Sequence, residues 1–143
     1  MPRFNHILVP VDFGEPSTRA VDLGIEMATA FSAALTIAHV WEIPVYPYMV
    51  PIAVDFLTPV EDAAKAQLAE VVAAARARFP SVDSLLRKGV AWQEIVAAIS
   101  EFGVDLVVMG THGRQGLSHV LLGSVAERVV RLSPVPVLTV RAP

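Results

Sequence analysis

Two kinds of hydrophobic pattern alternate along the chain. Short apolar runs rich in β-branched residues lie at residues 6–11, 35–40, 82–88, 105–109 and 136–140, of which the third is the weakest. Near-continuous apolar runs of this length are typical of strands in a parallel sheet that is covered on both faces. These five segments are therefore predicted strands.

Longer alanine-rich segments separate the apolar runs. They lie at residues 17–33, 59–79, 92–102 and 124–132, and their apolar residues recur every three or four positions. This spacing puts the apolar residues on one face of a helix, so four amphipathic helices are predicted. Ser17 is the expected N-cap of the first helix, and Gly103 is the expected C-cap of the third.

The order of these elements is β-α-β-α-β-α-β-α-β. Such alternation predicts a parallel sheet with right-handed crossovers, and five strands are too few for an eight-stranded barrel. The predicted fold class is α/β, an open five-stranded parallel sheet sandwiched by helices. A length of 143 residues suits one domain that spans residues 1–143.

One apolar segment, at residues 42–59, interrupts this alternation. Its prolines exclude a long helix or a central strand; they are Pro44, Pro47, Pro51 and Pro59. It also carries large apolar side chains, which are Tyr46, Tyr48, Met49 and Phe56. Two interpretations remain open, a flap over a ligand or partner and a structural loop that packs on its own domain.

Composition excludes several classes of protein. The chain has no cysteine, which rules out disulfides and Cys-ligated zinc or iron–sulfur sites. The longest stretch without a charged residue, 27–41, is shorter than the ~20 residues that a membrane-spanning helix needs. The first apolar run meets Asp12 at once and has no cleavage site after it, unlike a signal peptide. We therefore expect a cytoplasmic protein that does not contact membranes.

Charge is distributed unevenly. The formal net charge is −3, yet the final segment, 111–143, holds four arginines against one acidic residue, Glu127. These arginines are Arg114, Arg128, Arg131 and Arg141. A mildly acidic chain with one basic segment argues against nucleic-acid binding, which requires a broad basic face. The basic segment fits either a small anionic ligand or solvated helix positions.

A glycine-rich run follows the fourth predicted strand. It contains half of the chain's eight glycines, namely Gly110, Gly113, Gly116 and Gly123. Glycines between a strand and a helix let the backbone approach a ligand closely. The amides of the helix that begins near Ser124, together with its dipole, favour an anion, and Arg114 adds a charge. Because ligands of open parallel sheets lie at the carboxyl ends of the strands, this run predicts a phosphate site.

Other familiar sites find little support. The chain lacks the Gly-x-x-x-x-Gly-Lys motif of P-loop NTPases, the Gly-x-Gly-x-x-Gly motif of dinucleotide-binding dehydrogenases and the Gly-x-Ser-x-Gly elbow of serine hydrolases. The histidines lie on separate predicted elements without an i, i+4 pair; they are His6, His39, His112 and His119. This spacing argues against a structural transition-metal site. His39 is expected to be buried beside the first strand.

The glycine run resembles that of the universal stress protein family. The shared motif is Gly110-x2-Gly113-x9-Gly123-Ser124, with a buried strand before it and an amphipathic helix after it. Further similar stretches are Ile7-Leu8-Val9-Pro10-Val11-Asp12, Ala38-His39-Val40, Gly89…Glu94-Ile95 and Pro134-Val135-Pro136-Val137-Leu138. The resemblance covers nearly the whole chain and implies the Rossmann-like fold of adenine nucleotide alpha hydrolase-like proteins.

The resemblance implies ATP as ligand, with Mg2+ at its phosphates, and a homodimer through the last strand, which runs from Val135 to Val140. It implies that Pro10, Val11 and Asp12 line the adenosine, with Asp12 facing the ribose or a metal ion, and that Val40 touches the adenine. It implies that Met109, Gly110, His112, Gly113 and Arg114 surround the ribose and phosphates. Gly123, Ser124 and Val125 are then expected to hold the phosphates.

Two positions near the first strand leave alternatives open. Asp12 at the end of a strand serves either a ligand or the local turn. Relatives often have Gly-Ser after this aspartate, whereas the chain has Phe13-Gly14, so Phe13 is expected either to crowd the nucleotide or to stack near it.

Three functions fit these patterns. The first is a nucleotide-responsive dimeric signalling module that acts on an unidentified protein partner, with slow ATP hydrolysis at most. The second is an ATPase or nucleotidyl transferase at the same site, for which no poised base is evident. The third is a dimeric stress protein that does not use nucleotide.

Overall fold

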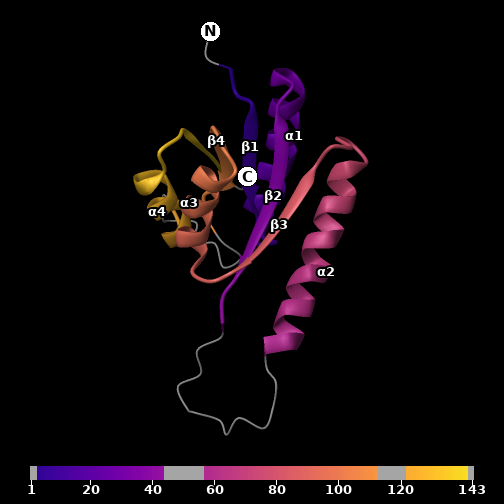
Figure 1. The fold of residues 1–143 in the computed structure, drawn as a ribbon, viewed down its shortest axis with the longest axis vertical. Coiled ribbons are helices and arrows are strands. Elements are labelled where there is room, and N and C mark those ends of the chain that lie inside the picture. Colours follow the sequence, from indigo (N-terminus) through magenta and orange to yellow (C-terminus); the bar gives the residue numbers. More distant parts are fainter. Residues whose placement is uncertain (1–2, 44–56, 113–121, 142–143) are drawn as a thin grey trace, which may run out of the picture.

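The computed structural model describes residues 3–43, 57–112 and 122–141. Strands and helices alternate along the chain, as the hydrophobic pattern predicts (Figure 1). The elements are β1 (His6–Pro10), α1 (Glu15–Phe31), β2 (Ala34–Trp41), α2 (Leu57–Arg76), β3 (Asp83–Lys88), α3 (Ala91–Glu101), β4 (Leu106–Gly110), α4 (Ser124–Leu132) and β5 (Val137–Val140).

The strands form a five-stranded parallel sheet in the order β3-β2-β1-β4-β5, which confirms the predicted fold class. Leu8 in the central strand pairs with Thr36 of β2 on one side and with Val107 of β4 on the other. The chain builds outward from β1 through β2 and β3, and then crosses to the other side of β1 for β4 and β5. In open parallel sheets this reversal of strand order creates a crevice at the carboxyl ends of the two strands beside it.

Alternate strand residues enter two hydrophobic layers. Ile7 and Val9 pack in a core with residues of α1 and α2, whereas Leu8 packs in a core with residues of α3 and α4. Figure 1 shows the same division, with α2 on one side of the strands and α3 and α4 on the other. All three strand side chains are essentially inaccessible to solvent. The apolar runs are thus explained by burial on both faces.

The start of α1 differs from the sequence prediction. The helix begins at Glu15 with Gly14 as its N-cap, and a proline lies in its first turn. Ser17 is therefore inside the helix, where its buried hydroxyl donates to the carbonyl oxygen of Gly14 at 3.0 Å. The N-cap assignment to Ser17 was wrong because the fixed φ of proline suits the first helical turn, so the helix includes Pro16.

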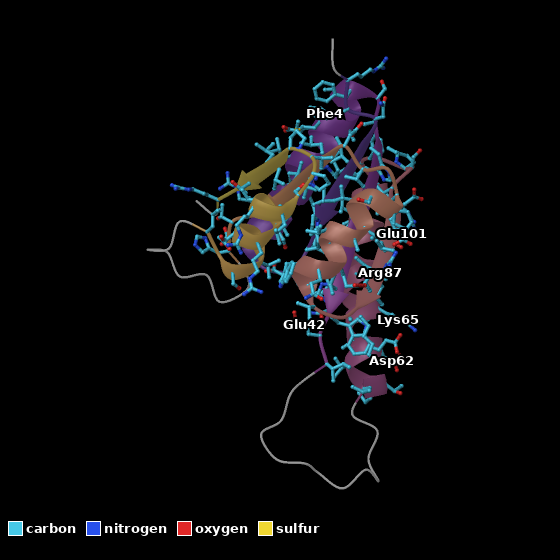
Figure 2. The ribbon with its side chains drawn as sticks, turned by 60° about the vertical axis from the view of Figure 1, so that its left-hand side comes forward. Phe4, Glu42, Asp62, Lys65, Arg87 and Glu101 are labelled. Carbon is cyan, nitrogen blue, oxygen red and sulfur yellow. The ribbon has the colours of Figure 1, made fainter. Side chains whose placement is uncertain are left out.

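The end of α3 follows the prediction more closely. Phe102 is the C-cap residue, and Gly103 after it has a φ of +64°, which favours glycine. On the nearby edge of the sheet, Arg87 of β3 pairs with Glu101 at 2.7 Å (Figure 2). Arg87 also lies 5.5 Å from the ring centre of Phe102. These contacts fasten β3 to the end of α3.

Within the described residues, no helix combines the length and the apolar character that crossing a bilayer requires. Most of the proline-rich segment at residues 42–59 lies outside the described residues, so its role stays a prediction.

Candidate functional site

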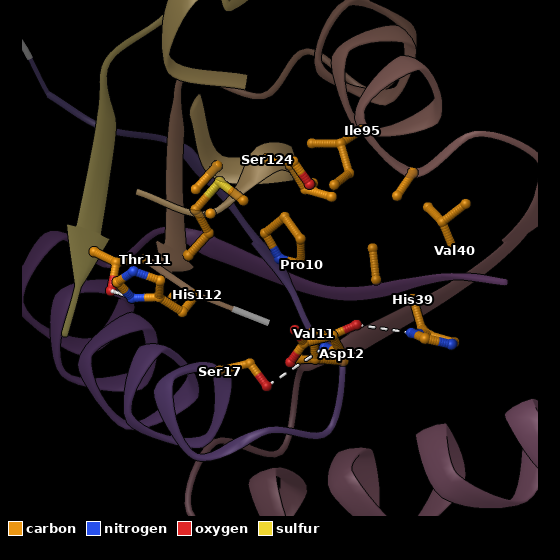
Figure 3. A pocket seen from close by; sticks show the side chains of 17 residues that line it. Pro10, Val11, Asp12, Ser17, His39, Val40, Ile95, Thr111, His112 and Ser124 are labelled. Carbon is orange, nitrogen blue, oxygen red and sulfur yellow. Dashed lines mark hydrogen bonds between the residues drawn. The ribbon is translucent and has the colours of Figure 1, made fainter. Parts of the chain in front are cut away.

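A cavity opens where the carboxyl ends of β1, β2 and β4 meet the starts of α1, α3 and α4 (Figure 3). Its volume is about 150 Å³. It is lined by Pro10, Val11, Asp12, Ser17, Ala38, His39, Val40, Ala91, Ile95, Met109, Gly110, Thr111, His112, Gly123, Ser124, Val125 and Ala126. The cavity therefore lies at the reversal of strand order, where ligands of this fold class bind.

Every predicted site residue that the structure describes lines this cavity. These residues are Pro10, Val11, Asp12, Val40, Met109, Gly110, His112, Gly123, Ser124 and Val125. The other two, Gly113 and Arg114, lie outside the described residues. The fold thus brings together residues that are more than one hundred positions apart in the sequence.

Several lining residues were missed from the sequence. They are Ser17, Ala38, His39, Ala91, Ile95, Thr111 and Ala126. Ala38 and His39 directly precede Val40, and Thr111 lies between two predicted site residues. These three could have been predicted because they are next to predicted site residues in the sequence. Ala91 and Ile95 enter the cavity only because α3 packs over β2, which no local pattern reveals.

Asp12 both shapes the turn after β1 and lines the cavity. Its Oδ1 accepts a hydrogen bond from the amide of Gly14 at 2.9 Å, an Asx-type turn. Its own amide donates to Oγ of Ser17 at 3.4 Å. Figure 3 shows Asp12 and Ser17 side by side at the edge of the cavity. The turn role that the sequence left open is present, and the carboxylate is held at the site.

Phe13 packs away from the cavity and is absent from its lining. Its ring lies against the ring of His39, with centroids 4.4 Å apart and planes inclined by 44°. His39 lies beside the end of β1, but it is half-buried rather than buried, and it lines the cavity. Its Nδ1 donates to the carbonyl oxygen of Val11 at 2.7 Å (Figure 3). The Phe13 ring therefore packs against His39 and does not line the cavity.

The end of β4 is tied to its neighbours by backbone bonds of Thr111. Its amide donates to the carbonyl oxygen of Val140, and its carbonyl oxygen accepts from the amide of Gly123. The Thr111 side chain is buried, and its Oγ1 lies 3.1 Å from Nδ1 of His112. This residue fixes the last strand and the start of α4 relative to β4.

Gly110 is required by a close backbone approach. A Cβ atom at this position would lie 2.7 Å from Cβ of Pro16 and 3.0 Å from the amide nitrogen of Ser17. Such distances are below normal van der Waals contact, so any side chain here would push the start of α1 away from β4. The close packing of these elements forms one wall of the cavity.

The starts of α3 and α4 differ in how their amides are satisfied. At α3, the amide of Ala91 donates to a carboxylate oxygen of Glu42 at 3.0 Å. At α4, Gly123 is the N-cap, and no side chain of the described residues caps the helix. The first-turn amides of a helix lack partners within it and carry its positive dipole end. The cavity wall at Ser124 is therefore suited to an anion.

The cavity has an apolar part and a polar part. Val40 and Ile95 lie on one side in Figure 3, and Thr111 and His112 lie on the other. Asp12 is the one carboxylate among the described lining residues. The apolar part suits a flat ring system, and the polar part suits hydroxyl and phosphate groups.

A metal cage made only of protein groups is not seen in the described residues. These contain no cluster of three or more His, Cys, Asp or Glu side chains that would hold an ion. Magnesium, however, is usually held by one or two carboxylates together with the phosphates of a bound ligand. The single carboxylate of Asp12 fits that mode of binding.

These features define a Rossmann-like α/β protein with a small-molecule cavity at the reversal of its strand order. The model of the universal stress protein family matches residues 3–141 of the chain. The chain therefore belongs to the universal stress protein family.

Individual relatives agree with this assignment. The chain is 30% identical to universal stress protein A homolog 1 of Coxiella burnetii, over 96% of either protein. Its fold matches that of the universal stress protein UspA from Lactobacillus plantarum with a TM-score of 0.79 and 25% identity, covering 99% of this chain and 100% of the other. It also matches a universal stress protein solved in complex with cAMP, with a TM-score of 0.75 and 27% identity over 97% and 98% of the two chains.

Proposed function

We propose that this protein is a nucleotide-responsive binding module that takes ATP in the cavity at the carboxyl ends of β1, β2 and β4. The observation that carries the proposal is the composition of the cavity, which is lined by every predicted nucleotide-binding residue in the described part of the chain. The structural relative in complex with cAMP supports an adenine nucleotide as the ligand class.

The shape of the cavity suggests how ATP would lie. A volume of about 150 Å³ is below the ~300–1,000 Å³ of pockets that enclose a whole ligand, so part of the nucleotide stays outside. The adenine would lie between Val40 and Ile95, and the ribose beside Asp12. The phosphates would then reach Ser124, which is exposed at the start of α4. Gly113 and Arg114 would add contacts to the phosphates.

Asp12 would hold Mg2+ together with the phosphates. When bound, this ion supplies charge neutralisation to the triphosphate. One oxygen of the Asp12 carboxylate already accepts from Gly14, which fixes the side chain in place. The described lining holds no second carboxylate that would serve as a general base, so binding is favoured over rapid hydrolysis.

The protein would act as a homodimer through β5. This strand lies at the edge of the sheet, and Leu138 in its middle has 37% of its surface exposed. Val130 and Leu132 of the adjacent α4 are exposed at 43% and 47%. An apolar edge of this kind favours pairing with a second copy across a two-fold axis. Replacing Leu138 with Asp should yield monomers in light scattering, and an unchanged mass would reject this interface.

Calorimetry with matched variants tests the nucleotide site. Ala91→Trp places a large ring in the cavity wall at the first residue of α3, whereas Ala97→Trp places the same ring on the exposed face of that helix. ATP with Mg2+ should bind the nucleotide-stripped protein and Ala97→Trp with equal affinity, and Ala91→Trp should lose at least tenfold. Equal binding by both tryptophan variants, or none by the unmodified protein, would contradict the proposal.

A further inference from the structure

The turn after β1 contains an unusual backbone conformation. Phe13 has a φ of +68°, in the left-handed region. Bulky residues rarely adopt this region, and they persist there only when surrounding contacts hold them. The contacts of the Phe13 side chain therefore help to hold its backbone in this disfavoured conformation.

One side chain, that of His39, holds the residues on both sides of Asp12. His39 Nδ1 lies 2.7 Å from the carbonyl oxygen of Val11, and it must donate because a carbonyl only accepts. The same imidazole contacts the ring of Phe13 at a centroid distance of 4.4 Å. Asp12 is thus bracketed by a hydrogen bond before it and a ring contact after it.

The turn after β1, which His39 contacts at Val11 and Phe13, orients the Asp12 carboxylate. Its Oδ1 accepts from the amide of Gly14, and the residue between the two is Phe13 with its left-handed backbone. Phe13 packs against the core under α1 and α2, while Asp12 lines the cavity. The ring of Phe13 therefore anchors the turn in the core, and the carboxylate remains available to the cavity.

We propose that Phe13 and His39 are positioning residues that hold the Asp12 carboxylate in its place for a nucleotide–magnesium ligand. This inference rests on the proposed nucleotide function. Phe13 acts through Asp12 and touches the core, and His39 links β2 to the turn. Removing the ring of Phe13 leaves the residue in a disfavoured conformation without the contact that maintains it.

We call the contacts of Phe13 and His39 with the turn around Asp12 the clamp. Its effect on the turn can be tested in the nucleotide-free protein. Amide hydrogen exchange of Gly14 reports its bond to Asp12, and the amide of Val11, which donates to the carbonyl oxygen of Ala38 at 2.8 Å, is an internal reference. Phe13→Ala should speed exchange at Gly14 at least fivefold relative to Val11, and Phe13→Tyr should restore it. Unchanged relative exchange in Phe13→Ala would overturn the inference.

A double-mutant cycle then tests whether the clamp acts through Asp12. Phe13→Ala should weaken binding of ATP with Mg2+ roughly fivefold, and it should have no further effect once Asp12 is replaced by Ala. An equal loss in both backgrounds would overturn the inference, because the ring would then act independently of the carboxylate. Because His39 also lines the cavity, its positioning role is measured without nucleotide. His39→Phe, which retains a ring but removes the donor, should speed exchange of the Gly14 amide by a smaller factor than Phe13→Ala, and unchanged exchange would overturn the role of His39.

These measurements separate the two proposals. If the unmodified protein fails to bind ATP, the proposed function is wrong, and the exchange of Gly14 still decides whether the clamp holds the turn. If the unmodified protein binds and Phe13→Ala binds equally well, the nucleotide site stands and the positioning role is overturned. All variants are measured at temperatures well below their unfolding transitions. Unfolding of a variant therefore does not affect its exchange rate or its ATP affinity.

Discussion

The two ends of the sheet differ in what their polar groups face. At the amino ends of the strands, the carboxylate of Asp105 accepts from the amides of Asn5 and His6 at 2.8 and 3.0 Å. The ring of His6 bonds to the carbonyl oxygen of Phe102 and to Oγ1 of Thr36 at 3.0 and 2.8 Å. At the carboxyl ends, the strands surround a cavity, and the start of α4 has no side-chain cap among the described residues.

This difference predicts that residues at the amino ends of the strands mainly affect stability, whereas polar residues at the carboxyl ends mainly affect ligand binding. Hydrogen bonds between groups of the chain stabilise the fold at both ends, but at the carboxyl ends the polar side chains also line a cavity in which a ligand would bind. Substitutions at the amino ends should therefore lower the free energy of unfolding without changing nucleotide affinity. Substitutions of polar side chains that line the cavity should mainly change affinity.

The largest expected effect on stability comes from adding a methyl group to Gly110, the last residue of β4. Gly110→Ala forces a Cβ against the start of α1 and should lower the free energy of unfolding by about 3 kcal/mol. Gly103→Ala, at the opposite end of β4, meets no atom within 4 Å and should cost only about 1 kcal/mol through its φ of +64°. Urea denaturation measures both, and equal losses would contradict the close packing at Gly110.

Asp105→Ala tests the closed end of the sheet. It removes the acceptor of two backbone amides and should lower the free energy of unfolding by about 2 kcal/mol. ATP affinity should stay unchanged, since Asp105 is remote from the cavity lining. Asp83→Ala, at an exposed position in β3, is the control and should change stability by less than ~0.5 kcal/mol. A loss of ATP affinity in Asp105→Ala would contradict the prediction that substitutions at the amino ends of the strands affect only stability.

Asp12→Asn tests the open end. The amide oxygen can still accept from Gly14, so the free energy of unfolding should change by less than ~0.5 kcal/mol. Affinity for ATP with Mg2+ should fall roughly tenfold, which corresponds to about 1.4 kcal/mol. Calorimetry without Mg2+ is the control, because the charge of Asp12 then repels the phosphates and its removal should not weaken binding. A tenfold loss in both conditions would exclude a role at the metal ion.

The smallest effect is expected at the contact between α3 and α4. Arg128, in the middle of α4, lies 5.3 Å from the ring centre of Trp92 near the start of α3, and it links the two helices whose first residues, Ala91 and Ser124, line the cavity. Arg128→Ala should weaken ATP binding about twofold, in line with a cation–π contact of roughly 0.5–1 kcal/mol. Lys88→Ala removes a similar contact, 5.6 Å from the ring centre of Trp41, that joins β3 to β2 and does not connect α3 with α4. It should leave affinity unchanged, and a loss equal to that of Arg128→Ala would reject the proposed coupling.

The sequence predicts the fold well because burial on both faces leaves a strong local signal. Strands such as β4, which is buried along nearly its whole length, appear as apolar runs, and the amphipathic helices appear between them. The start of α1 was misassigned because two local signals compete there. A serine favours the N-cap and a proline favours the first turn, and the proline at Pro16 prevailed.

The candidate site was predictable only where its residues carry a local motif. The glycines and Ser124 follow a recognisable spacing, and Asp12 ends an apolar strand. Ile95 carries no such mark, because it enters the cavity through the packing of α3 over the sheet. The contact of Phe13 with His39 joins two strand ends that are remote in sequence, so the clamp emerges only from the fold.

Backbone amide shifts measured by NMR during a titration with ATP and Mg2+ test the division between the two ends most directly. We predict that the shifted amides cluster at the carboxyl ends of the strands and at the start of α4, including those of Asp12, Thr111 and Ser124. The amides of His6 and Asp105 should keep their positions. Shifts centred on the amino ends, or none at saturating ATP, would contradict a nucleotide site at the reversal of strand order.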